Sequence, residues 1–174
     1  MLKRKIEKIL SDWKKDPYRK PLILKGARQI GKTTSILAFA EKNYQSTILI
    51  NFYEHPEYKR IFEDGYSPDA VIQNISLINP AFRFIPESTL IFFDEIQENM
   101  DATTSLKFFA LDGRYDVICS GSSLGIHYHD VSSVSVGYKK DADMFSMDFE
   151  EFLWACGYGE ELTAKIEDHM LSLT

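Results

Sequence analysis

The chain has 174 residues, of which 44% are hydrophobic, so it can bury one sizeable core, and its length suits one domain better than two. The formal net charge of −6 argues against a basic surface over the whole chain. Only residues 1–20 have an excess of basic residues, with eight Lys and Arg against three Asp and Glu. No apolar run approaches the length of a membrane span and the amino terminus has no signal-peptide core, so neither a membrane protein nor an exported one is expected.

A basic amphipathic pattern opens the chain and ends at Pro17. Its apolar positions recur at helical spacing: Leu2, Ile6, Ile9, Leu10 and Trp13. We expect residues 1–20 to form a helix packed on the main domain, residues 21–174. The Lys and Arg residues between the apolar positions are typical of a solvated helix face, and contact with nucleic acid is the alternative.

A short apolar strand, Leu22 to Leu24, leads into the most informative stretch of the sequence, residues 26–34. Gly26 and Gly31, followed by Lys32 and Thr33, match the Walker A pattern, in which backbone N–H groups wrap a polyphosphate. In this pattern Lys32 reaches the β- and γ-phosphates and the Thr33 hydroxyl binds Mg²⁺. The helix that begins there adds the positive end of its dipole. The alternative is a glycine-rich turn that matches by accident.

The following segments alternate between helix and strand. A helix with a packed apolar face follows the loop, and residues 47–52 predict a second strand. Pro56 and Pro68 suit first helical positions, Ser67 suits an N-cap and Gly65 a stop, so two short helical pieces are expected between residues 56 and 80.

The second half continues the alternation. Strands are predicted at residues 90–95 and 116–121, with a helix at 103–111 between them. A fifth strand is expected at residues 144–147, and Asp148 with Glu151 predicts a capping box that starts a last helix. This order is typical of an α/β fold with a mostly parallel sheet in three layers.

Two carboxylates end the strand at residues 90–95. Asp94 is expected to hold Mg²⁺ as a Walker B carboxylate does, and Glu95 to orient and deprotonate an attacking water. Two ordinary surface acids are the alternative. Ser120 and Ser122, within the run that continues to Ser123, are candidate sensors of the γ-phosphate, and a turn of small residues is the alternative there.

Other metal and redox chemistry is not expected. His127 and His129, beside Asp130, lack further ligands for a metal. Cys119 and Cys156 are too few for a disulfide framework, and neither lies in a metal-ligand spacing. This cysteine usage predicts a reducing, cytoplasmic location.

Five segments together resemble a known family. They are Gly-Ala-Arg-Gln-Ile-Gly-Lys-Thr-Thr at 26–34, Leu-Ile-Phe-Phe-Asp-Glu-Ile-Gln at 90–97, Ser-Leu-Lys-Phe-Phe at 105–109, Ser-Gly-Ser-Ser-Leu-Gly at 120–125 and Asp-Phe-Glu-Glu-Phe-Leu at 148–153. The chain resembles the amino-terminal domain of the prokaryotic AAA-type ATPases whose carboxyl-terminal half is a domain of unknown function. The resemblance implies a P-loop NTPase with sheet order 5-1-4-3-2.

The resemblance also implies a site for ATP and Mg²⁺. Lys32 and Glu95 are then catalytic, and Thr33 and Asp94 hold the metal. The nucleotide-binding residues are Gly26, Ala27, Arg28, Gln29, Ile30, Gly31, Lys32, Thr33, Thr34, Asp94, Ser120 and Ser122.

The chain departs from the family at two points. Val136-Gly137-Tyr138 stands where relatives often carry Val-Gly-Arg, and no Arg follows Arg114. Relatives also continue into a lid and a carboxyl-terminal domain, which we expect to be absent from residues 21–174. Because an arginine commonly contributes about 10³ to 10⁵ in the rate of phosphoryl transfer, we expect ATP binding with slow hydrolysis.

Two other functions stay open. One is a nucleotide-sensing interaction module with little turnover, whose partner is a protein or a nucleic acid. The other is a small-molecule kinase, which needs a cationic lid that the sequence does not supply. The sequence defines neither a protein partner nor an oligomeric state.

Overall fold

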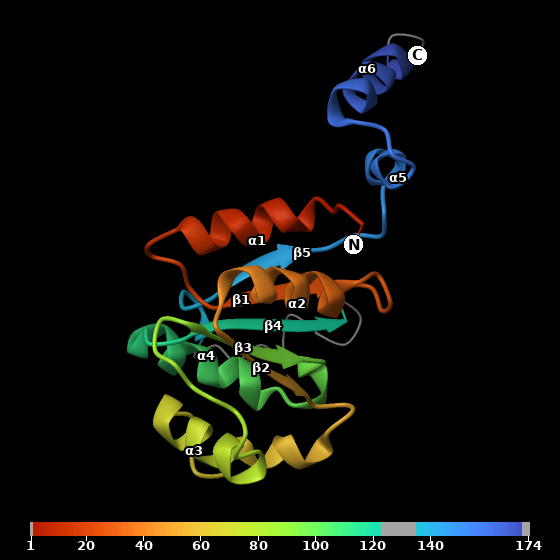
Figure 1. The fold of residues 1–174 in the computed structure, drawn as a ribbon. Coiled ribbons are helices and arrows are strands. Elements are labelled where there is room, and N and C mark those ends of the chain that lie inside the picture. The colour runs from red at the N-terminus through yellow and green to blue at the C-terminus, as the bar shows by residue number, and fades with distance from the viewer. Residues whose placement is uncertain (1, 123–134, 172–174) are drawn as a thin grey trace.

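The computed structural model describes residues 2–122 and 135–171. Its five described strands are all paired in parallel and form one sheet in the order β2-β3-β4-β1-β5 (Figure 1). The strands are β1 (Leu22–Gly26), β2 (Ser46–Asn51), β3 (Thr89–Asp94), β4 (Asp116–Ser122) and β5 (Lys140–Asp143). The predicted α/β class and the order 5-1-4-3-2 are confirmed.

Helices cover both faces of the sheet. On one face lie α1 (Ile6–Lys15) and α2 (Lys32–Asn43), which bury Leu10 and Trp13 of α1 against Ile36 and Phe39 of α2. The 3₁₀ helix η1 (Pro56–Phe62), α3 (Pro68–Ile78) and α4 (Asp101–Asp112) pack on the other face. A short 3₁₀ helix, η2 (Ile96–Glu98), connects β3 to α4.

Strand β3 shows why the sequence reads as a continuous apolar run. Ile91 and Phe93 belong to the core under α3 and α4, whereas Leu90 and Phe92 belong to the core under α1 and α2. Successive side chains of a strand point to opposite faces, so a strand covered on both sides needs apolar residues at every position. This burial fixes the carboxyl end of β3, where Asp94 lies.

The fifth strand was predicted at the wrong residues. It runs over Lys140–Asp143 instead of residues 144–147, and it pairs with β1 so that Leu22 lies opposite Lys140 and Lys25 opposite Asp143. An edge strand does not need two apolar faces, and here the ion pair between Lys25 and Asp141, 3.0 Å long, joins it to β1. The apolar signal at Met144 marks instead a residue buried just beyond the strand.

Helix starts agree with the predicted capping residues. Ser67 accepts a hydrogen bond from Ala70 N at the start of α3, and Gly65 before it has a φ of 107°. Asp148 and Glu151 form the predicted capping box of α5 (Phe149–Ala155). Two predicted core positions of the first helix are not buried: Leu2 precedes α1 and is 51% exposed, and Ile9 is 40% exposed.

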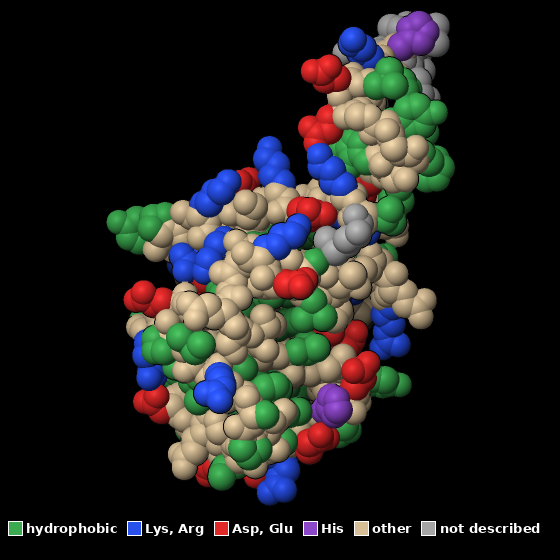
Figure 2. All heavy atoms as spheres, in the orientation of Figure 1, with side chains coloured by type: hydrophobic (Ala, Val, Ile, Leu, Met, Phe, Trp, Pro, Cys, Tyr) green, Lys and Arg blue, Asp and Glu red, His purple; other side chains and the backbone are tan. Residues whose placement is uncertain are grey.

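The last two helices, α5 and α6 (Glu160–Leu171), extend away from the sheet, and the amino terminus lies beside the segment that leads to them (Figure 1). Figure 2 shows hydrophobic side chains gathered on this extension, where Phe149, Phe152 and Leu162 are about half exposed, whereas Leu153 is buried. Of the helices in the described residues, none has the length and apolar character needed to cross a membrane.

Candidate functional site

The loop between β1 and α2 has a backbone that tolerates few side chains. A Cβ at Gly26 would lie 2.4 Å from the Met144 carbonyl oxygen, so this position requires glycine. Gln29 and Gly31 have φ values of 62° and 95°. Gly31 is also the N-cap of α2, and no side chain of the described residues caps that helix. Its first N–H groups therefore face the loop with the positive end of the helix dipole, which suits an anion.

Lys32 is the buried cation of this loop. Its side chain is 6% exposed, and Nζ donates hydrogen bonds to the carbonyl oxygens of Gly26 at 2.9 Å and Ala27 at 2.6 Å. Burial lowers the pKa of Lys32, and the negative charges of Glu95 and Asp94 oppose that shift. The other predicted loop residues, Ala27, Arg28, Gln29 and Thr34, are exposed, and Ile30 is half-buried.

Asp94 lies where the carboxyl ends of β2, β3 and β4 meet the amino terminus of α2. The residue is 2% exposed, and its carboxylate accepts hydrogen bonds from Thr33 Oγ1 at 2.8 Å, from Asn51 Nδ2 at 3.4 Å, from Glu95 N at 3.0 Å and from Ser120 Oγ. Thr33 lies in the first turn of α2, Asn51 is the last residue of β2, and Ser120 lies two residues before the end of β4. The predicted metal pair, Thr33 and Asp94, is thus in direct contact.

The donor set at this point suits Mg²⁺. Mg²⁺ prefers oxygen ligands and is usually held by one or two carboxylates, with the remaining positions taken by water and phosphate. Thr33 and Asp94 supply a hydroxyl and a carboxylate 2.8 Å apart at the mouth of the loop. Within residues 2–122 and 135–171, no cluster of three or more His, Cys, Asp and Glu forms a site for a more heavily coordinated metal.

Glu95 lies just outside β3 in a constrained backbone conformation. Its φ is 55°, the left-handed region that non-glycine residues rarely occupy, so the chain turns sharply after Asp94. The Glu95 carboxylate accepts a hydrogen bond from Gln97 Nε2, and Gln97 Oε1 accepts one from Ser122 N at 3.3 Å. Gln97 therefore joins the predicted catalytic carboxylate to the end of β4.

The two predicted sensor serines have different surroundings. Ser120 is fully buried and donates to Asp94, whereas Ser122 is 4% exposed and contacts Gln97 through its backbone N–H. Ser123, His127, His129 and Asp130 lie outside the described residues.

Sequence reasoning assigned no role in the site to Asn51, Gln97 or Arg4. Asn51 pairs in register with Asp94 across β2 and β3, so its place at the end of a strand was an available signal. Arg4 donates from Nη1 to the Ile30 carbonyl oxygen at 3.0 Å, across 26 residues of sequence. No spacing pattern predicts that contact.

Two other candidate cations, Arg114 and Lys139, are engaged elsewhere. Arg114 precedes β4 and so lies at the amino-terminal ends of the strands, whereas Asp94 lies at their carboxyl ends. It forms ion pairs with Asp69 at 2.7 Å and Asp112 at 2.8 Å. Lys139 pairs with Asp141 at 2.6 Å.

The chain is similar to one known family and to solved structures. The sequence matches the family described as "AAA domain" over residues 18–153, and no curated protein matches the chain at a significant level. A solved structure of C. elegans PCH-2 is 12% identical, with a TM-score of 0.46, and the match covers 81% of this chain and 42% of that one. A DNA replication initiation factor is 13% identical, with a TM-score of 0.50, and the match covers 81% of this chain and 45% of that one.

The chain spans less than half the length of either solved structure. At 13% identity, the likeness to the initiation factor supports the fold alone. The family match, in contrast, extends over most of the chain and includes both the loop at residues 26–34 and the strand that ends at Asp94. The chain belongs to the AAA domain family.

Proposed function

We propose that this chain binds Mg²⁺-ATP and hydrolyses it slowly, with Lys32, Thr33, Asp94 and Glu95 as the working residues. The observation that carries the proposal is the 2.8 Å hydrogen bond between Thr33 and Asp94, because it joins the phosphate-binding motif to the acidic motif of a second strand. Neither motif alone separates a nucleotide site from a glycine-rich turn or a pair of surface acids.

Each working residue has a distinct task. The N–H groups of the loop and of the first turn of α2 bind the phosphates. Lys32 exchanges its contacts with the Gly26 and Ala27 carbonyl oxygens for the β- and γ-phosphates. Thr33 and Asp94 would hold Mg²⁺, which would supply positive charge beside the phosphoryl group. Glu95 orients and deprotonates the attacking water.

A cavity beside the loop suits the base of the nucleotide. Its volume is about 230 Å³, and Leu2, Arg4, Gly31, Thr34 and Ser35 line it. Pockets that enclose a whole drug-sized ligand measure roughly 300–1,000 Å³, so this one suits a part of the nucleotide. It adjoins Gly31, where the loop meets α2.

The positions of Arg4, Arg114 and Lys139 support slow turnover. Arg4 contacts the loop, but Ile30, Phe145 and Glu151 hold its guanidinium. An arginine that reaches the phosphoryl group commonly contributes about 10³ to 10⁵ in rate. Arg114 is paired with Asp69 at the amino-terminal ends of the strands, and Lys139 is paired with Asp141. Lys139 also lacks the planar fork of a guanidinium.

The test separates binding from turnover with Glu95→Gln. This variant should bind a fluorescent ATP analogue as the wild type does and release no phosphate above background. The wild type should turn over far below about 10 per second, the median of characterised enzymes. Turnover near that median, or undiminished turnover in Glu95→Gln, would contradict the assignment. Release of phosphate without an added acceptor separates a hydrolase from a small-molecule kinase.

The second candidate function is a nucleotide-sensing interaction module in which binding alters a surface read by a protein. The half-exposed Phe149, Phe152 and Leu162 on α5 and α6 favour a protein partner. A nucleic-acid partner is less supported, because Lys3, Arg4, Lys5 and Lys14 pair with acidic residues of the chain itself. Retention of nucleic acid in a filter-binding assay that weakens steeply with salt would support that alternative.

The two free cysteines support a cytoplasmic location.

A further inference from the structure

Three consecutive basic residues precede α1 and all contact the carboxyl-terminal elements. Lys3 pairs with Glu160 of α6 and lies 5.0 Å from the centre of the Trp154 ring. Lys5 pairs with Asp148 at 2.7 Å and with Glu150 at 2.5 Å, at the start of α5. The amino-terminal segment therefore anchors the extension formed by α5 and α6.

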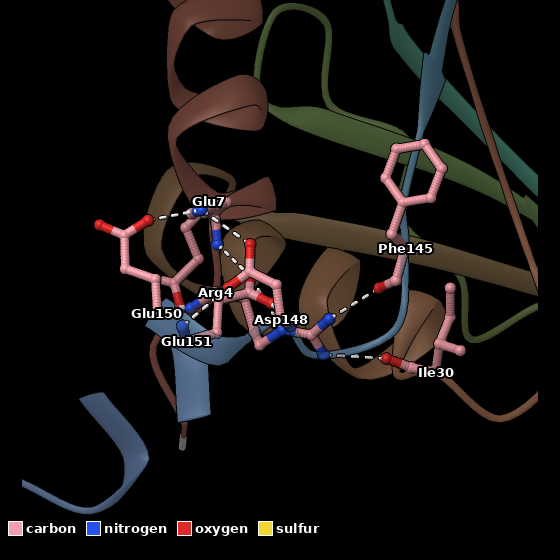
Figure 3. A network of polar contacts seen from close by, with 8 residues as sticks. Arg4, Glu7, Ile30, Phe145, Asp148, Glu150 and Glu151 are labelled. Atoms are coloured by element: carbon pink, nitrogen blue, oxygen red, sulfur yellow. Dashed lines mark hydrogen bonds and ion pairs between the residues drawn. The ribbon is translucent and has the colours of Figure 1, made fainter. Parts of the chain in front are cut away.

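Arg4 differs from its neighbours because it also contacts the nucleotide loop (Figure 3). Nη1 donates to the Ile30 carbonyl oxygen at 3.0 Å, and Nη2 donates to the Phe145 carbonyl oxygen at 2.9 Å. Nε lies 3.1 Å from Glu151 Oε1 in an ion pair whose angle does not suit a hydrogen bond. One guanidinium thus joins the loop, the segment before α5, and α5 itself.

The contact with Ile30 orients a peptide group of the loop. In a trans peptide the carbonyl and the following N–H point in opposite directions, so holding the Ile30 oxygen toward Arg4 turns the Gly31 N–H away from it. A charged donor on the carbonyl also polarises the peptide and strengthens that N–H as a donor. Arg4 therefore acts on the loop through Ile30, in addition to lining the cavity beside Gly31.

The segment after β5 braces the other end of the loop. Met144 N donates to the Lys25 carbonyl oxygen at 2.7 Å, and the Met144 carbonyl oxygen occupies the space that a side chain at Gly26 would need. Because Phe145 accepts from Arg4, this segment touches the start of the loop directly and its end through the guanidinium.

Glu151 connects the same guanidinium to the start of α5. Its side chain is 6% exposed, and Oε2 accepts from Asp148 N at 3.2 Å to close the capping box. Oε1 accepts from Lys5 N at 2.7 Å beside the ion pair with Arg4. Moving Arg4 would leave a buried carboxylate without its charge partner, which is costly.

We propose that Arg4 is a positioning residue that couples the nucleotide loop to α5 and α6. The loop conformation that binds phosphate and the placement of the extension then favour each other, with equal strength in both directions. The proposal rests on the proposed nucleotide binding for its output. The contacts that carry it lie within the chain and can be tested without nucleotide.

The first arm of the test is hydrogen exchange without nucleotide. Arg4→Gln should speed exchange in the loop, in the first turn of α2 and in the first turn of α5, by about tenfold. Arg4→Lys, which lacks the planar fork, should do the same to a smaller extent. The control is Lys8→Gln, which removes an exposed basic residue of α1. It should leave the loop unchanged. Equal exchange in the loop of wild type and both Arg4 variants would overturn the proposal.

The second arm uses Cys156, which is exposed at the end of α5, as a fluorescent reporter. Cys119 is fully buried and burial raises the pKa of its thiol, so labelling is selective. In wild type, Mg²⁺-ATP should change the fluorescence at Cys156. In Arg4→Gln, nucleotide affinity should fall about tenfold and the change should be lost at saturation, whereas Lys8→Gln should keep the affinity.

The two arms separate failure of the coupling from failure of the proposed function. If the wild type binds no nucleotide, the proposed function is wrong, and hydrogen exchange alone then decides whether Arg4 holds the loop. If the wild type binds nucleotide and Arg4→Gln matches it in affinity and fluorescence, the coupling is wrong and nucleotide binding stands.

Discussion

Thr33 Oγ1 donates a hydrogen bond to Asp94 Oδ2 at 2.8 Å across 61 residues of sequence. The two residues come from different elements, the first turn of α2 and the last position of β3. They meet because β1 and β3 run parallel with β4 between them, so that the carboxyl ends of both strands lie on the same side of the sheet. Open α/β sheets bind ligands at the carboxyl ends of their strands.

The first prediction concerns the metal. Asp94→Asn keeps the shape of the side chain and removes its charge, so it should abolish most of the increase in nucleotide affinity that Mg²⁺ produces in the wild type. Titrations with a fluorescent ATP analogue, with and without Mg²⁺, measure this. Asp12→Asn, an exposed acid on α1, is the control. An unchanged response to Mg²⁺ in Asp94→Asn would rule out this carboxylate as the metal ligand.

The second prediction concerns Gln97, which holds the Glu95 carboxylate and the Ser122 N–H. A positioned general base contributes about 10² to 10⁴ in rate, so a loosened one loses part of that. Gln97→Ala should lower kcat by about tenfold or more and leave nucleotide affinity unchanged. Gln45→Ala, at an exposed position outside the site, is the control. A rise in KM with unchanged kcat would mean that Gln97 serves binding instead.

The fold could be predicted from the sequence because central strands that are buried on both faces need apolar residues at every position. Leu90 to Phe93 illustrate this, since each is fully buried. The edge strand was misplaced because Lys140 to Asp143 carry no such run, and pairing with β1 rather than hydrophobicity defines them. The apolar residue that drew the prediction, Met144, packs against the loop instead.

The arrangement of the candidate residues was predictable where a sequence motif defines them and not where it depends on tertiary contacts. Gly26, Lys32, Thr33 and Asp94 follow patterns of fixed spacing, and the structure brings them together. Arg4 reaches the loop from a segment before α1, and it donates hydrogen bonds there to backbone carbonyl oxygens, which every residue type has. A sequence pattern contains no information on such a contact.

The third prediction concerns acid stability. Burial raises the pKa of Asp116, but hydrogen bonds from Arg19, Lys14 and Tyr44 outweigh it, so the pKa lies below its ordinary value. A depressed pKa in the folded state stabilises the protein above the unfolded pKa of about 4 and loses that contribution as the pH falls below it. Asp116→Asn should therefore lower the free energy of unfolding by about 1–3 kcal/mol at pH 7.

Urea denaturation of the wild type and Asp116→Asn at pH 7, 5 and 3 measures this effect. The difference between the two proteins should be the same at pH 7 and 5 and smaller at pH 3. Asp64→Asn, at an exposed acid, is the control. A difference at pH 3 as large as at pH 7 would show that Asp116 acts through packing rather than through its charge.

The most direct test of the central claim is calorimetric titration of the wild type and Lys32→Ala with Mg²⁺-ATP. Lys42→Ala, at the exposed end of the same helix, is the matched control. A charged hydrogen bond is worth about 1.5–3 kcal/mol, so Lys32→Ala should weaken binding by at least about tenfold. Wild type and Lys42→Ala should bind alike. Equal binding by wild type and Lys32→Ala would contradict the assignment of residues 26–34 as the nucleotide loop.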